Sequence, residues 1–257
     1  MLELKQKSSF SLHKKGTHEF IKLEVKAEEF QNLVSGLMGL IPEHYVDPIS
    51  VARTLELLGK HAAAEKLKIK IPEAKKIRSG DIGEIAATDY IEDETPYTVP
   101  IRKLRWRDHR NMAMRGDDVI GVLFSPQDNT IKFLKTEAKG NKALSTNVLE
   151  KARAELDLDD GLPAPHALSF ISERLNAMGE YELADRIEKA QLVDGIQSNQ
   201  VEHLLFTFTQ SDPNSLQKAA FDGYGGNIKQ NSVGVKVNNH QELIASVYQG
   251  VLDGLND

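Results

Sequence analysis

The triplet Glu137-Ala138-Lys139 places an acid and a base at a spacing that could support hydrolysis. In an extended strand, residues two apart project from the same face, so the carboxylate and the ammonium would lie side by side. The chain contains four Glu-x-Lys triplets, which begin at Glu3, Glu24, Glu73 and Glu137. The spacing alone is therefore a weak signal, and the surrounding sequence has to distinguish the triplets.

The triplet at Glu137 ends an apolar segment that follows another apolar segment opened by an acid. The two segments, 117–124 and 131–138, are joined by the turn-forming residues 125–130. If they pair as a regular antiparallel hairpin, Asp118 lies opposite Glu137, with the Cβ atoms roughly 4.5–5.5 Å apart. Asp117 would then point to the opposite face. A β-bulge would break this register, so the prediction is conditional on a regular hairpin.

Two carboxylates this close repel each other, and the pKa of one rises unless a cation lies between them. Ligation by oxygen atoms alone suits Mg²⁺, with Mn²⁺ as an alternative. A bound metal could lower the pKa of a water molecule and stabilise charge on a phosphoryl oxygen. We therefore expect Asp118 and Glu137 to bind the metal and Lys139 to hold or activate the water. Glu84, on a preceding helix, is a plausible fourth catalytic residue and metal ligand. The alternative is that these residues are surface acids with an ordinary lysine partner.

The net charge of −6 argues against a protein that coats nucleic acid by bulk charge. The charge is uneven, because residues 1–149 carry 24 Lys and Arg against 21 Asp and Glu, whereas residues 150–257 carry 8 against 17. The most basic segment contains Arg102, Lys103, Arg105, Arg107, Arg110 and Arg115. We expect any contact with a DNA backbone to lie in this basic segment. The alternative is a solvated basic strand and loop.

Several elements have to position these residues. The apolar periodicity predicts a helix over 79–93, strands over 98–107, 117–124 and 131–138, a helix over 144–156, helices within 166–192, and a strand over 203–209. Upstream, it predicts a strand over 21–25, a helix over 27–40, and a helix that Asp47 caps and Pro48 opens. This order indicates a mixed α/β fold.

At these residues the sequence resembles the PD-(D/E)XK nuclease superfamily. The matching parts are Gly83-Glu84, residues 116–121, and Glu137-Ala138-Lys139. The resemblance implies a core of helix, three strands, helix and strand, with Mg²⁺ held by the acids and the lysine at the reacting water. It also implies a division into an N-terminal α+β extension, residues 1–75, and a nuclease-like domain, residues 76–257, whose C-terminal part is acidic.

The wider chain resembles the HamA family, the nuclease-like subunits of the bacterial Hachiman anti-phage system. The likeness is carried by residues 80–84, 100–107, 135–140 and 147–153. It implies a helicase partner, HamB, and an effector that degrades DNA but is restrained at rest. We expect the helicase to contact residues 1–75 and the acidic residues 150–257.

Other classes of protein have less support. The chain has no cysteine, which excludes disulfides, thiolate zinc sites, iron–sulfur clusters and a cysteine nucleophile. No HExxH, Gly-x-Ser-x-Gly or dinucleotide fingerprint occurs. No apolar run could span a membrane and the first residues lack a signal peptide's apolar core, so we expect a cytoplasmic protein. The prediction is a Mg²⁺-dependent DNA nuclease; the alternatives are a non-catalytic adaptor of a helicase and a stand-alone restriction endonuclease.

Overall fold

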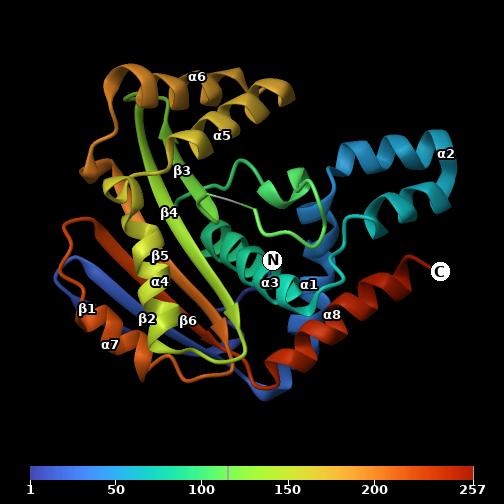
Figure 1. Ribbon diagram of the computed structural model, residues 1–257, viewed down its shortest axis with the longest axis horizontal. Coiled ribbons are helices and arrows are strands. Elements are labelled where there is room, and N and C mark those ends of the chain that lie inside the picture. Colours follow the sequence, from blue (N-terminus) through green and yellow to red (C-terminus); the bar gives the residue numbers. More distant parts are fainter. Residues whose placement is uncertain (115, 257) are drawn as a thin grey trace.

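A six-stranded mixed sheet forms the centre of the computed structural model, which describes residues 1–114 and 116–256 (Figure 1). In the order in which they pair, the strands are β1 (Ser8–Lys15), β2 (His18–Val25), β6 (Lys229–Lys236), β5 (Val201–Thr209), β4 (Thr130–Asn141) and β3 (Val119–Ser125). The outer pairs β1–β2 and β3–β4 are antiparallel, and the inner pairs are parallel. The prediction of a mixed α/β fold is confirmed.

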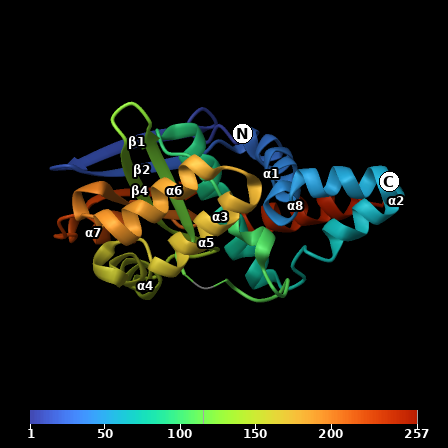
Figure 2. The same ribbon diagram turned by 90° about the horizontal axis from the view of Figure 1, so that it is seen from above.

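Helices cover both faces of the sheet. They are α1 (Phe30–Tyr45), α2 (Pro48–Lys68), α3 (Lys75–Glu94), α4 (Thr146–Asp157), α5 (Pro165–Met178), α6 (Tyr181–Lys189), α7 (Leu216–Asp222) and α8 (His240–Gly254). One face packs against α1, α3 and α8, and the other against α4 to α7. Both views show α2 at the end of the molecule away from β1 (Figures 1 and 2). In the described residues, no helix is long and apolar enough to cross a membrane.

The β3–β4 hairpin has the register that the sequence predicts. Val119 pairs with Thr136 and Ser125 pairs with Thr130, without a bulge between them. Extending this ladder by one residue brings Asp118 opposite Glu137. Both strands lie over α3, where Gly83 of the helix approaches the backbone of Gly140 so closely that a Cβ atom on Gly83 would lie 2.6 Å from the Gly140 nitrogen.

The strand predicted over 98–107 is wrong. Only Thr98 joins the sheet, through an isolated bridge to Val122, and Lys103–Trp106 is a 3₁₀ helix. Pro100 has no N–H to donate to a ladder, so the pairing does not continue beyond Thr98. Ile101 then enters the core under α5, whereas Leu104 enters the core on the other face of the sheet. This three-residue spacing suits a 3₁₀ turn rather than the alternation of a strand.

The N-terminal segment belongs to the same sheet and core as the rest. β2 pairs with β6 in parallel, and α1 packs against α8. The largest hydrophobic cluster runs from Leu2 to Val251. The boundary predicted at residue 75 therefore falls within a continuous sheet and core. The predicted strand at 21–25, the helix after it and the Asp47 cap are confirmed, since Asp47 accepts a hydrogen bond from the Ser50 N–H at 2.8 Å.

Candidate active site

Asp118, Glu137 and Lys139 come together at the open end of the β3–β4 hairpin. Asp118 precedes β3, and its Oδ2 accepts a hydrogen bond from the Ala138 N–H at 2.9 Å. Glu137 lies on β4 and is 6% exposed, with its Oε1 bound to the Lys139 ammonium. The backbone bond to Ala138 fixes Asp118 against β4, so the predicted set is assembled by a single hairpin.

Burial and mutual repulsion perturb the acids of this cluster. Burial, reinforced by the neighbouring Asp118 carboxylate, raises the pKa of Glu137 to about 8, although Lys139 opposes the rise. Burial lowers the pKa of Lys139, but the Glu137 and Asp118 carboxylates outweigh it and raise that pKa above its ordinary value. The cluster therefore has the charge conflict that a cation would relieve.

Glu84 faces the same cluster from α3. Burial, reinforced by the nearby Asp118 carboxylate and opposed by Lys103, raises its pKa to about 8. The close packing of α3 on β4 brings Glu84 toward the hairpin, because Gly83 and Gly140 have no side chains to separate the two elements. The structure thus places the fourth predicted residue within electrostatic reach of Asp118.

Lys103 is the member of the basic segment that enters this site. Its ammonium donates to the Asp117 carbonyl oxygen at 2.7 Å and lies 3.8 Å from Asp118 Oδ1. Its side chain is only 13% exposed, which holds the cation against the carboxylates. Lys103 and Lys139 therefore flank the acidic pair as internal cations.

The other members of the basic segment do not form one exposed patch. Arg102 pairs with Glu92 at 2.9 Å, and Arg105 donates to the Glu43 carbonyl oxygen at 2.6 Å. Arg110, the most exposed of the three, pairs with Glu73. Arg115 lies outside the described residues. Arg102 and Arg105 both lie at Glu43 of α1, whereas Arg110 pairs with Glu73, so these arginines are engaged by acidic or carbonyl groups of the chain.

Arg107 is a buried structural residue. It is 5% exposed, and its guanidinium donates two hydrogen bonds to Asp81, at 2.8 Å to Oδ2 and 2.5 Å to Oδ1. A side chain in this position cannot grip a DNA backbone without leaving its carboxylate unpaired in the core. The DNA-binding role predicted for Arg107 therefore does not agree with its position.

Asp117 and Lys135 are positioning residues that were not predicted from the sequence. The Asp117 carboxylate accepts a hydrogen bond from the Ala164 N–H at 2.8 Å and lies 3.6 Å from the Lys135 ammonium. Lys135 is 1% exposed and donates to the carbonyl oxygens of Leu158 and Leu162. The alternation Lys135, Glu137, Lys139 along β4 was the available signal, since all three project from one face.

The donor atoms of these residues suit a divalent cation. However, among the described residues, too few side chains are arranged together to form a complete set of metal ligands. Asp118, Glu137 and Glu84 offer only carboxylate oxygens, which Mg²⁺ prefers. Within residues 1–114 and 116–256, no three His, Cys, Asp or Glu side chains are arranged as a metal cluster. Lys139 engages Glu137 directly, so a metal at this site would have to displace or share that contact.

The fold and the site together define a mixed α/β protein that carries an acid–acid–lysine cluster at the end of a β-hairpin. The sequence profile of the HamA family matches residues 2–251, and the chain belongs to that family. A similar protein of Bacillus cereus, named Hachiman protein HamA, is 30% identical over 139 residues. This match covers 53% of the chain and 48% of the relative, so the chain spans about half the length of the curated protein that it matches.

Proposed function

We propose that this protein is a metal-dependent DNA nuclease that hydrolyses phosphodiester bonds. The main support for the proposal is that Asp118, Glu137 and Lys139 lie together at one end of a hairpin. The resemblance of Gly83-Glu84, residues 116–121 and Glu137-Ala138-Lys139 to the motifs of PD-(D/E)XK nucleases agrees with it. The raised pKa values of Glu137 and Glu84 support a site prepared for added positive charge.

Each residue of the cluster has a distinct role in this proposal. Asp118 and Glu137 would hold Mg²⁺, which would supply charge stabilisation at the phosphoryl group and a more acidic water molecule. Lys139 orients that water and offsets charge on the phosphate. Glu84 supports the metal or its water from α3. Lys103 and Arg105, with the more exposed Arg102 and Arg110, contact the DNA backbone.

We further propose that the nuclease is the effector of a Hachiman defence complex and that a helicase partner controls it. The name of the Bacillus cereus relative supports the assignment to this system. Restraint at rest is supported by the contacts of the cluster, because Lys139 and Lys103 already engage the carboxylates that would bind the metal. Activation would require these internal cations to move toward the substrate.

The same contacts favour a second candidate, a non-catalytic adaptor with a nuclease-like fold. In this alternative, the two lysines neutralise the carboxylates permanently. The absence of a three-residue metal cluster in the described part of the chain agrees with this reading. The two candidates differ in whether DNA is cleaved.

Cleavage of plasmid DNA in Mg²⁺, Mn²⁺ or EDTA tests the proposal. Wild type is compared with Glu137→Ala/Lys139→Ala, each with and without the helicase and ATP. We expect metal-dependent cleavage that the double substitution abolishes, and a requirement for the helicase if the chain is its effector. Equal inertness of both proteins beside an active helicase would favour the adaptor.

A further inference from the structure

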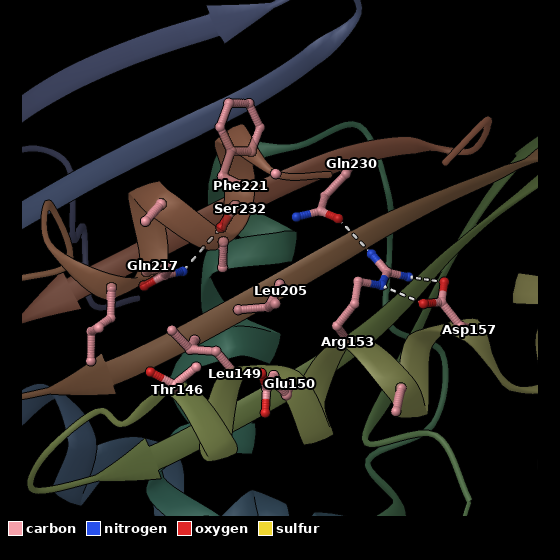
Figure 3. Close-up of a pocket in the computed structure, with 15 residues that line it drawn as sticks. Thr146, Leu149, Glu150, Arg153, Asp157, Leu205, Gln217, Phe221, Gln230 and Ser232 are labelled. Carbon is pink, nitrogen blue, oxygen red and sulfur yellow. Dashed lines mark hydrogen bonds and ion pairs between the residues drawn. The ribbon is translucent and has the colours of Figure 1, made fainter. Parts of the chain in front are cut away.

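A cavity of about 540 Å³ lies on the sheet between α4 and α7 and shares no residue with the candidate nuclease site (Figure 3). Its volume is within the range of about 300–1,000 Å³ that is usual for small-molecule sites. Leu149 of α4, Leu205 of β5 and Phe221 of α7 provide apolar walls. The space is therefore a slot between two helices, with the sheet as its floor.

Buried polar side chains line this cavity, Gln230 and Ser232 from β6 in the floor and Gln217 from α7 in the wall. Gln217, Gln230 and Ser232 are each no more than 2% exposed. Gln217 accepts a hydrogen bond from Thr207 at 2.6 Å and donates one to Ser232 Oγ at 3.1 Å. These hydrogen bonds offset the cost of burying the polar groups and hold their side chains in fixed orientations at the cavity.

The network orients two hydrogen-bond donors toward the cavity. Arg153 only donates, so the Gln230 atom that it contacts must be the amide oxygen, and the amide nitrogen points away from it into the cavity (Figure 3). That nitrogen has no hydrogen-bond partner in the described part of the chain. Ser232 Oγ accepts from Gln217, which leaves its hydrogen free to donate. The floor thus offers N–H and O–H groups to a ligand.

The charges around the cavity select against anions. Asp157 forms an ion pair with Arg153 at 2.8 Å, so the guanidinium is already neutralised. Glu150 is exposed on the lining and adds negative charge without an ion pair in residues 1–114 and 116–256. A phosphate or carboxylate ligand would meet this charge, whereas a neutral ligand with carbonyl acceptors would not.

We propose that the cavity between α4 and α7 binds a neutral nucleoside, whose flat ring lies between the apolar walls and whose keto oxygens accept hydrogen bonds from Gln230 and Ser232. Amide donors recognise base edges in this way elsewhere. The lining shares no residue with the proposed nuclease centre, but the two sites are neighbours, because Leu205 of the lining pairs with Glu137 in the sheet.

Calorimetric titration of the full chain with uridine and thymidine tests this proposal. We expect both nucleosides to bind at millimolar concentration or below, uridine monophosphate to bind more weakly, and ribose not to bind. Ser232→Ala and Gln230→Leu should each reduce the affinity by roughly five- to tenfold, the loss expected for one hydrogen bond. Ser232→Ala is the smaller change and keeps the test valid if Gln230→Leu, which removes the Arg153 partner, fails to fold.

A blocking variant locates the binding site. Ala220 lies exposed on α7 at the cavity, so Ala220→Trp should fill the space and abolish binding, whereas Ala177→Trp, at an exposed position on α5, should not. Asp118→Asn, which changes the nuclease cluster on the far side of β4 from the cavity, should bind nucleosides like wild type, which separates this proposal from the nuclease. No binding to wild type, binding that survives Ala220→Trp, or a preference for the monophosphate would each overturn it.

Discussion

Glu137 is a buried acid whose ionisation costs stability and which the proposed function places at the metal. Its carboxyl lies 6% exposed beside Asp118 and the Lys139 ammonium. Burial raises its pKa from the ordinary value of 4.5 to about 8. The folded state therefore binds a proton that the unfolded state releases between these two values. Ionisation of Glu137 therefore lowers the stability of the folded protein. The ionised carboxylate is also the form that would bind a cation most strongly.

Glu137→Gln is expected to stabilise the protein more at about pH 9 than at about pH 6. Because the folded pKa is above the unfolded one, the stability that the protonated carboxyl provides is complete below about pH 4.5 and is lost as the pH rises through about 8. Glutamine has no proton to lose. Since one unit of pKa corresponds to about 1.4 kcal/mol, we expect a difference of about 1–3 kcal/mol between the two pH values.

Urea unfolding without metal, followed at both pH values, measures this effect. Glu150→Gln, on the exposed side of α4, is the matched control and should show a small difference. An equal gain for Glu137→Gln at both pH values would contradict a raised pKa in the folded state.

Among the elements, α3 and β4 define the geometry of the site by their close approach. A Cβ atom on Gly140 would lie 1.9 Å from the Ser79 carbonyl oxygen. Ser79 Oγ also donates to the Gly140 carbonyl oxygen at 2.5 Å. The helix therefore rests on the backbone of the strand, and Glu84 reaches the hairpin only because no side chain separates them.

Gly140→Ala should destabilise the protein by about 1–3 kcal/mol or more, because overpacking forces the two backbones apart. Gly80→Ala is a matched control on α3, where an added Cβ meets nothing within 4 Å. Alanine at this helical position should stabilise by about 0.5–1 kcal/mol. Thermal unfolding of both variants measures the difference, and similar effects of the two changes would show that the contact is not close.

The 3₁₀ helix at Lys103–Trp106 is the element through which the basic segment reaches the site. If Lys103 contacts a DNA backbone, Lys103→Ala should weaken binding to all sequences by a similar factor. It should also reduce the slope of log affinity against log salt by about 1. Fluorescence anisotropy in EDTA measures binding without cleavage. Lys68→Ala, on an exposed part of α2, is the control, and an unchanged slope for Lys103→Ala would remove the role.

At the scale of the whole molecule, a buried polar network joins segments that are far apart in the chain. Tyr45 of α1 donates to Asp81 of α3 at 2.6 Å and contacts the Tyr248 hydroxyl of α8 at 2.6 Å. Arg107 completes the network through its two bonds to Asp81. The N-terminal and C-terminal helices are thereby tied to the helix that carries Glu84.

Arg107→Met is expected to lower the free energy of unfolding by about 3–5 kcal/mol, because it leaves the Asp81 carboxylate unpaired in the core. Adding Asp81→Asn removes that charge and keeps an acceptor for Tyr45, so the double variant should recover part of the loss. Chemical unfolding of the single and double variants measures the coupling. Losses that simply add would exclude a direct interaction between the two side chains.

The sequence by itself determined the local parts of this protein. The turn-forming residues 125–130 between two apolar segments predicted the β3–β4 register, so Asp118 and Glu137 could be placed opposite each other. Amphipathic periodicity and the Asp47 cap located α1 to α4, because these signals depend only on neighbours in the chain. The family membership, too, was visible in the motifs around Glu84 and Glu137.

Only the tertiary structure decided what depends on distant partners. β6 was not foreseen, and it lies between β2 and β5, which joins the N-terminal segment to the rest of the sheet. The basic segment is uniform in sequence, yet Lys103 enters the site while Arg107 is buried against Asp81. The spacing in the sequence determines the face of an element from which a side chain projects. The oppositely charged partner of that side chain comes from a distant part of the chain, and tertiary packing brings the two together.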